Sequence, residues 1–361
     1  MEQQDTRYSL SKEYFGPLWK YVENEHITNI DWDSGQLWVE FADRPRTGVT
    51  DSEINEEFMM DFATRVGIHA QKNFNQTDRE VSTETDTLRI TCLHPSFSVS
   101  GVTVCMRKSL PKLRFNTERA LKSGYCSKEV MFMLLNCVRA KMNFTFCGAP
   151  GKGKTEAGKF FSSFIQPNEK VITIEDVREW HYKEINPNKS CIELKLKQHS
   201  EFEQALALAV RLNPTWLIPA ETRGREVRYL LEAWSNGISN MNTIHTRGVK
   251  EIVDRILNML GSDVDIDSAT DQIYNNAGIG VYLDKVVENG KNKYFIKEVG
   301  FFSRKDEVNR VDLVVEDGVF YPERIPDFIK QEIEAKVGTD LFECPFAFDN
   351  TAPVIEEELV Q

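Results

Sequence analysis

The segment from Gly148 to Thr155, GAPGKGKT, has the residue types and spacing of a phosphate-binding loop. It matches G-x-x-x-x-G-K-[ST] directly after the apolar run FTFC and before an expected helix, which is the context that the motif requires. Gly148, Gly151 and Gly153 let the backbone turn so that its N–H groups point at phosphate oxygens, and the helix dipole adds a positive end. We expect Lys154 to reach the β- and γ-phosphates, and the Thr155 hydroxyl to ligate Mg²⁺.

The other residues of the loop are Ala149, Pro150 and Lys152, and we place them in the same nucleotide-binding segment. Lys152 has two open interpretations, which are a contact to phosphate and a solvated lysine on the loop. A chance glycine-rich turn explains the segment poorly, because all eight residues fit the motif in the right setting.

Carboxylates follow the next two apolar runs. Glu175 and Asp176 end VITI, Glu179 comes about one helical turn later, and Glu221 ends the run Trp216–Ala220. An attacking water and a magnesium ion both need such oxygens, so these residues are candidates for catalysis. We expect Glu175 and Glu221 to serve as metal ligands with Thr155, and Glu221 to polarise the hydrolytic water.

A proline precedes Glu221. Pro219 stands inside the third apolar run, and because proline removes a ladder hydrogen bond we expect a bulge there.

A histidine follows a fourth, short run. His245 comes directly after Asn242-Thr243-Ile244, at the end of an expected strand. We predict that His245 senses the γ-phosphate by hydrogen bonding and is not the principal base.

The elements that must position these residues alternate between strand and helix. Such alternation predicts a parallel, doubly wound sheet, whose ligands bind at the carboxyl ends of the strands. Earlier in the chain, β-rich runs flank a helical pattern, which indicates an α+β domain. The expected elements are strands 36–41, 88–93 and 99–106 with helix 52–72 in the first domain, and helices 128–141 and 154–165 with strands 143–147 and 171–174 in the second.

The predicted domain organisation has four parts. Residues 1–108 form the N-terminal α+β domain, 109–124 a basic linker, 125–345 the P-loop domain, and 346–361 an acidic tail that we expect to be mobile.

Composition narrows the class of protein. The 361 residues are 41% hydrophobic and 28% charged, an ordinary globular balance. The net charge of −12 argues against a general nucleic-acid or anionic-membrane coat. The seven cysteines are scattered without a C-x-x-C pair, as is typical of a reducing compartment. No run approaches the ~20 apolar residues that span a bilayer, so we expect a cytoplasmic protein that partners recruit to the membrane.

The order of four segments, GAPGKGKT, VITIEDVRE, ALALAVRLNPTWLIPAETRG and NGISNMNTIHTRG, resembles the type II/type IV secretion ATPases. That superfamily contains conjugation and effector-secretion hexamers and pilus motors. The resemblance implies a RecA-like C-terminal domain and a PAS-like N-terminal domain. It also implies an acidic box at Glu175, Asp176 and Glu179, a catalytic Glu221 followed by Arg223, and a histidine box at His245.

The resemblance extends into the first domain through LRITCLHPSFSVSGVTVCMRK. It implies that Arg89 and Arg107 approach the phosphates when the domains close, where guanidinium groups suit phosphate oxygens. It further implies ATP with Mg²⁺, a homo-hexameric ring and inner-membrane partners of a secretion, conjugation or pilus apparatus.

Three departures from the family pattern bear on hydrolysis. Ala220 replaces a glycine, Pro219 interrupts the apolar run, and the histidine box contains less glycine. A nucleotide-gated scaffold with little hydrolysis is therefore one alternative to the motor. A nucleic-acid motor is another, because 107–128 is basic, but its leucines and single Phe115 offer little for stacking, and we expect no stable nucleic-acid binding.

Overall fold

The computed structural model describes residues 10–262, 264–345, 352, 354 and 355. The acidic tail predicted at 346–361 therefore lies outside the described residues, apart from Ala352, Val354 and Ile355. The chain divides into two compact units. The first runs through Leu110 and includes Val287–Asn292, and the second comprises Pro111–Val286 with Lys293–Val354.

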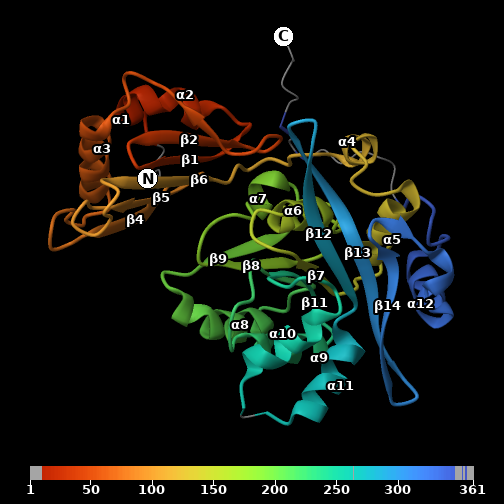
Figure 1. Ribbon diagram of the computed structural model, residues 1–361. Coiled ribbons are helices and arrows are strands. Elements are labelled where there is room, and N and C mark those ends of the chain that lie inside the picture. Colours follow the sequence, from red (N-terminus) through yellow and green to blue (C-terminus); the bar gives the residue numbers. More distant parts are fainter. Residues whose placement is uncertain (1–9, 263, 346–351, 353, 356–361) are drawn as a thin grey trace. The chain divides into compact units, whose positions relative to one another are not determined.

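The first unit is a six-stranded antiparallel sheet with helices, in agreement with the predicted α+β class. The strand order is β3-β2-β1-β6-β5-β4, and Phe62 and Val66 of α3 are fully buried in the same core as the strands. Asn55 caps α3 by accepting the Phe58 N–H at 2.9 Å. The elements, seen in Figure 1, are α1 Lys12–Phe15, α2 Trp19–Glu23, β1 Ile27–Asp33, β2 Gln36–Phe41, β3 Thr47–Val49, α3 Glu56–His69, β4 Glu80–Glu84, β5 Leu88–Leu93 and β6 Thr103–Lys108.

The second unit contains a nine-stranded sheet in the order β15-β14-β13-β12-β7-β11-β10-β8-β9. The pairs from β12 to β9 are parallel, as predicted, whereas β14 pairs antiparallel with β13 and β15. Its elements are α4 Thr117–Lys122, α5 Lys128–Arg139, β7 Phe144–Cys147, α6 Lys154–Ser162, β8 Val171–Glu175, α7 Tyr182–Ile185, β9 Cys191–Lys195, α8 Phe202–Arg211, β10 Trp216–Pro219, α9 Val227–Ser235, β11 Ser239–Ile244, α10 Glu251–Leu260, α11 Ile266–Asn276, β12 Ile279–Glu288, β13 Lys291–Lys305, β14 Val308–Glu316, β15 Val319–Phe320 and α12 Asp327–Val337.

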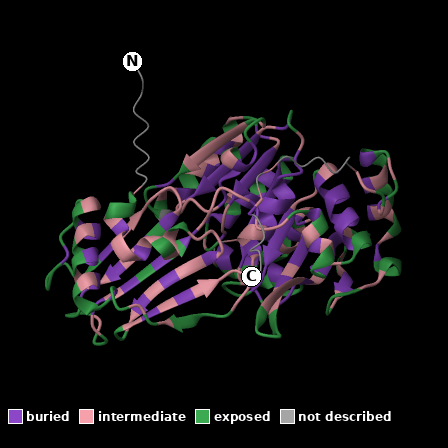
Figure 2. Cartoon of the chain, turned by 90° about the horizontal axis from the view of Figure 1, so that it is seen from above, coloured by how far each residue is buried: buried purple, intermediate pink, exposed green. Residues whose placement is uncertain are grey.

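Helices cover both faces of the parallel strands, of which β7, β8 and β10 are largely apolar, whereas β11 buries polar side chains such as Asn240 and Asn242. Phe144 and Phe146 of β7 pack with helices α5, α6 and α12, while Cys147 and Ile244 pack with α9, α10 and α11. Every residue of β7, β8, β10 and β11 is buried, which Figure 2 shows as purple strands. Burial on both faces explains the continuous apolar runs of β7, β8 and β10.

The segment 109–124 contains the helix α4, and Leu113 is only 1% exposed. Asn116 caps this helix by accepting the Arg119 N–H at 2.9 Å. Phe115 packs its ring against those of Tyr125 and Phe160, at 4.9 and 4.8 Å between centroids. The segment from Pro111 onward is therefore grouped with the second unit.

The bulge expected at Pro219 is not present in the pairing of β10 with β8, whose register is continuous through Pro219. Trp216 and Ala220 both donate their N–H toward the β8 side, to the carbonyls of Lys170 and Ile174. Pro219 therefore faces β11, and the pairing of β10 with β11 has already ended at Leu217. The missing N–H falls where no ladder bond is needed, so an interior strand accepts the proline at its last position.

In the part of the chain that is described, no helix combines the length and the apolarity needed to cross a bilayer.

Candidate active site

The phosphate-binding loop has the backbone that its glycines predict. Gly148, Gly151 and Gly153 all have positive φ angles, +149°, +71° and +84°, which residues with a Cβ adopt rarely. A Cβ on Gly148 would also lie 2.7 Å from the carbonyl oxygen of Leu283 in β12. Gly153 is the N-cap of α6, so the loop opens directly into the helix, whose N-terminus is the end that suits an anion.

Lys152 has a role that neither of its two interpretations foresaw. Its ammonium group pairs with Asp284 Oδ1 at 2.6 Å and donates to the carbonyl oxygen of Lys285 at 3.1 Å. Burial would raise the pKa of Asp284, but its hydrogen bond from Lys152 holds that pKa below the ordinary value. The pair attaches the loop to β12, and no spacing in the sequence indicates it.

The candidate catalytic residues form a continuous chain of contacts beside the loop. Lys154 Nζ lies 3.2 Å from His245 Nδ1, and His245 Nε2 lies 2.9 Å from Glu221 Oε1. Glu221 Oε2 accepts from Arg223 Nη2 at 2.6 Å, and Arg223 Nη1 lies 3.3 Å from Asp176 Oδ2. Four strand ends contribute to this chain: β7 through the loop, then β11, β10 and β8. The parallel sheet thus brings together five of the predicted residues.

His245 Nδ1 has two neighbours, because it lies 3.2 Å from Lys154 Nζ and 3.2 Å from the carbonyl oxygen of Gly148. Burial and the Lys154 ammonium hold the pKa of His245 below its ordinary value, although Glu221 acts in the opposite direction. The neutral ring donates from Nε2 to Glu221 and accepts at Nδ1 from Lys154, whereas a hydrogen bond to the Gly148 carbonyl needs a proton on Nδ1. Lys154 also donates to the carbonyl oxygen of Ala149 at 3.0 Å, so its ammonium group is folded back over the loop.

Glu221 is the central acid of this chain. Burial would raise the pKa of Glu221, but the hydrogen bond and charge of Arg223, with His245 and Lys154 nearby, hold it below the ordinary value. The carboxylate is therefore ionised at neutral pH and can accept a proton or orient a water. The neighbouring Ala220 donates to Ile174 of β8 and accepts from the Thr243 hydroxyl at 2.8 Å, so the two departures near Glu221 leave its placement regular.

Glu175 differs from the other carboxylates because it is buried, with 4% exposure. Its Oε1 accepts the N–H groups of Glu179 at 3.1 Å and Trp180 at 2.8 Å. Burial raises the pKa of Glu175 to about 8 against the effect of these two bonds. The geometry shows Glu175 shaping the turn that carries Glu179, and its predicted metal role stays a prediction.

Trp180, in the same turn after β8, packs against α6. It is fully buried, donates its indole N–H to Ser162 Oγ at 3.1 Å, and lies against Gly158 of α6. A Cβ on Gly158 would come within 2.2 Å of Trp180 Cη2. This contact joins the turn after β8 to the helix that follows the phosphate loop, and the sequence analysis did not identify it.

A second buried carboxylate shapes the turn that carries Arg223. Glu226, which is 4% exposed, accepts the N–H groups of Arg223 at 2.7 Å and Gly224 at 2.8 Å through Oε1. The sequence analysis also missed Glu226. A glutamate three residues after Arg223 is the only local signal for it.

The oxygen atoms that could hold Mg²⁺ are those of Thr155 and Glu179. Thr155 Oγ1 donates to Glu179 Oε2 at 3.4 Å, so a hydroxyl and a carboxylate face each other at the start of α6. A donor set of oxygens fits a hard cation, which usually completes its shell with phosphates and waters. Within the described ranges, no three acidic, histidine or cysteine side chains are grouped as a metal site. The metal role predicted for Glu221 stays a prediction.

Arg89 and Arg107 lie in the first unit, on neighbouring strands. They are direct cross-strand partners in the pairing of β5 with β6, and both are exposed. Directly opposite residues of an antiparallel pair lie on the same face of the sheet, so Arg89 and Arg107 together make that exposed face basic. Their predicted approach to the phosphates stays a prediction.

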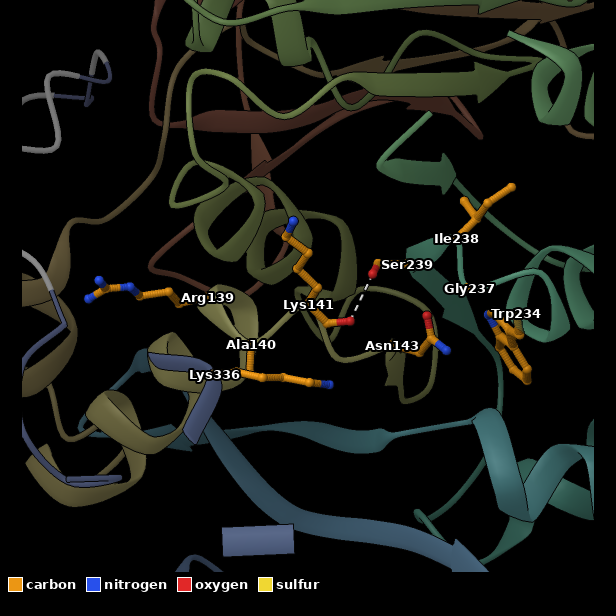
Figure 3. Close-up of a pocket in the computed structure, with 9 residues that line it drawn as sticks. All are labelled: Arg139, Ala140, Lys141, Asn143, Trp234, Gly237, Ile238, Ser239 and Lys336. Atoms are coloured by element: carbon orange, nitrogen blue, oxygen red, sulfur yellow. Dashed lines mark hydrogen bonds between the residues drawn. The ribbon is translucent and has the colours of Figure 1, made fainter. Parts of the chain in front are cut away.

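A pocket of about 530 Å³ lies at the other ends of the strands. Asn143 precedes β7 and Ser239 begins β11, so the pocket opens at the amino ends of the parallel strands (Figure 3). Its lysines are paired, Lys141 with Glu169 at 3.2 Å and Lys336 with Glu332 at 2.8 Å. None of the predicted site residues lines it.

A P-loop opening a helix, with carboxylates and a histidine at the adjacent strand ends, defines a P-loop NTPase. The profile described as Type II/IV secretion system protein matches residues 75–277, more than half of the chain. The chain belongs to this family, which confirms the resemblance seen in the sequence.

Curated relatives match the chain over part of their length. An uncharacterised protein of Bacillus anthracis is 24% identical over 264 residues, covering 72% of this chain and 59% of that protein. The VirB11 protein of Rhizobium radiobacter is 24% identical over 203 residues, covering 52% of this chain and 58% of that protein.

Solved structures share the fold. The Legionella pneumophila ATPase DotB aligns with a TM-score of 0.55 at 18% identity, covering 84% of this chain and 83% of that one. The pilus retraction motor PilT with bound ADP aligns with a TM-score of 0.59 at 14% identity, covering 92% and 91%. At such low identity the likeness establishes the fold alone, and it confirms the predicted α/β class with a P-loop domain and a smaller α+β domain.

Proposed function

We propose that this protein is an ATP-hydrolysing, ring-forming motor, a homo-hexamer by family analogy, that powers secretion, conjugative transfer or pilus assembly. The observation that carries the proposal is the chain of contacts from Lys154 through His245 and Glu221 to Arg223. These contacts support the proposal because they join the Lys154 ammonium, the Glu221 carboxylate and the Arg223 guanidinium beside the phosphate loop, where we expect the γ-phosphate of a bound nucleotide.

The geometry supports separate tasks for these side chains. The loop amides bind the phosphates, and Lys154 exchanges the Ala149 carbonyl and His245 for phosphate oxygens. When Lys154 leaves, His245 Nδ1 takes up a proton and donates it in a hydrogen bond to the γ-phosphate. Glu221 orients the attacking water and accepts its proton, while Arg223 keeps that carboxylate ionised before the reaction.

For the metal, we propose Thr155 as a ligand and Glu179 as its nearest acidic partner, with Glu175 acting through the turn that positions Glu179. Bound Mg²⁺ would neutralise charge that develops on the β- and γ-phosphates. We further propose that Arg89 and Arg107 contribute to the phosphates on domain closure, and that the ring docks on the cytoplasmic face of inner-membrane partners.

The first experiment measures Mg-ATP binding by calorimetry and phosphate release by the assembled oligomer, for wild type and Lys154→Ala. We expect hydrolysis in the wild type and its loss in the variant. Lys122→Ala is the matched control, because Lys122 is 76% exposed and forms an ion pair with Glu118 one turn away on the same helix, α4. Unchanged hydrolysis in Lys154→Ala would contradict the motor.

The nucleotide-gated scaffold differs from the motor in turnover. The regular geometry at Pro219 and Ala220 removes the main structural reason to expect slow hydrolysis. Mg-ATP binding and ring assembly without phosphate release would favour the scaffold, and DNA-stimulated hydrolysis with a steep salt dependence would favour a nucleic-acid motor.

A further inference from the structure

An aromatic ring stands at the start of α6, beside the last glycine of the phosphate loop. A Cβ on Gly153 would lie 3.4 Å from Cδ1 and 3.8 Å from Cε1 of Tyr294, a half-buried residue of β13. The loop is held on this side by backbone packing of Gly148 on β12 and by the Lys152–Asp284 pair. Tyr294 therefore borders the loop at its last glycine.

The order of strands shows which end of a bound triphosphate this ring would meet. The strands β11, β10 and β8, which carry His245, Glu221 and Asp176 at their ends, lie on one side of β7, and β12 and β13 lie on the other. The γ-phosphate fits the side of β7 that carries these three residues, because the Lys154 ammonium lies there beside His245. A triphosphate in the loop runs away from that end, so its nucleoside leaves toward β12 and β13.

We propose that the ring of Tyr294 is the surface on which the base of the bound nucleoside triphosphate packs; this rests on the proposed function. Lys285 Nζ lies 5.5 Å from the centroid of the ring. A cation–π contact at this distance is weak at an exposed site, so a stacking base competes with the cation for the ring. Stacking accepts any base because every base has a π face. The larger purine ring gains more contact area than a pyrimidine.

The test is calorimetric binding of Mg-ATP, Mg-GTP, Mg-CTP and Mg-tripolyphosphate to the full-length chain, for wild type, Tyr294→Ala and Tyr294→Phe. We expect wild type to bind ATP and GTP within a few fold of each other and more tightly than CTP. Tyr294→Ala should weaken Mg-ATP binding at least about tenfold and leave tripolyphosphate binding unchanged. Tyr294→Phe should match wild type, because the ring carries the contact.

Tyr321→Ala is the matched control, since Tyr321 is also half-buried and packs against a cation, Arg324, at 3.8 Å from its ring centroid. It should leave every affinity unchanged.

Two results with the Tyr294→Ala variant would overturn the proposal. One is unchanged ATP binding, and the other is an equal loss for ATP and tripolyphosphate, which would make Tyr294 a support of the loop. Wild type alone also tests it: equal affinity for ATP, CTP and tripolyphosphate would refute base stacking even if the alanine variant did not fold. Binding of none of these ligands would instead refute the proposed function.

Discussion

Glu221→Gln removes one charge from the middle of the chain of contacts while it keeps the size of the side chain. The carboxylate oxygens lie 2.9 Å from His245 Nε2 and 2.6 Å from Arg223 Nη2. A glutamine oxygen can accept from one of these donors, but its amide group then faces the other donor. The Glu221 and Arg223 side chains are 23% and 45% exposed, and such pairs contribute about 0–1 kcal/mol to stability. The melting temperature should therefore fall by no more than about 4 °C.

The effect on hydrolysis should be much larger. A positioned general base accelerates a reaction by about 10²–10⁴-fold, so kcat should fall by about that factor. This loss corresponds to a rise of about 2.7–5.4 kcal/mol in the activation free energy. Mg-ATP binding should persist, because the loop amides and Lys154 hold the phosphates. The assay is steady-state phosphate release by the oligomer, with calorimetric Mg-ATP binding and a thermal melt on the same preparation.

Glu203→Gln is the matched control, since Glu203 is an exposed residue in the first turn of α8. It should change neither rate nor binding. A kcat for Glu221→Gln within about threefold of wild type, with binding intact, would refute the assignment of Glu221 as the base.

Three further changes test the surroundings of Glu221. Arg223→Ala removes the cation that favours the charged form of Glu221, so the pKa of Glu221 should rise and the acid limb of the kcat–pH profile should move to higher pH; an unmoved limb would contradict the contact. The direction follows from the lowered pKa of Glu221 in the folded protein. The stabilisation that Arg223 gives to the charged carboxylate is present above the unfolded-state pKa of Glu221 and is lost as the pH falls through its folded-state pKa. Glu226→Ala leaves the partly buried N–H groups of Arg223 and Gly224 without this acceptor and should lower kcat at least about tenfold, whereas Glu226→Gln should retain activity; equal rates would argue against positioning. Gly158→Ala would force a Cβ to 2.2 Å from Trp180 and should cost about 1–3 kcal/mol, read as a lower melting temperature, and a wild-type melt would show that Trp180 can move.

Much of the fold could be predicted because its signals are local. The strand Leu88–Leu93 and the strand Gln36–Phe41 occur as expected, and the helix expected at 52–72 spans Glu56–His69. The strand expected at 99–106 begins later, at Thr103, because residues 99–102 form turns. The antiparallel strands β13 to β15 were not predicted, since their pairing depends on distant parts of the sheet and no short motif marks it.

The sequence by itself determined the phosphate loop, because a run of eight residues carries its own geometry: three glycines at positive φ and a helix start. It also placed carboxylates and a histidine at strand ends. Only the tertiary structure decided what each carboxylate does. Glu175 and Glu179 are four residues apart and alike in chemistry, yet one is buried under two backbone N–H groups and the other faces the Thr155 hydroxyl. Burial and the identity of partners from other strands set charge and hydrogen bonding, and neither is encoded within any one segment.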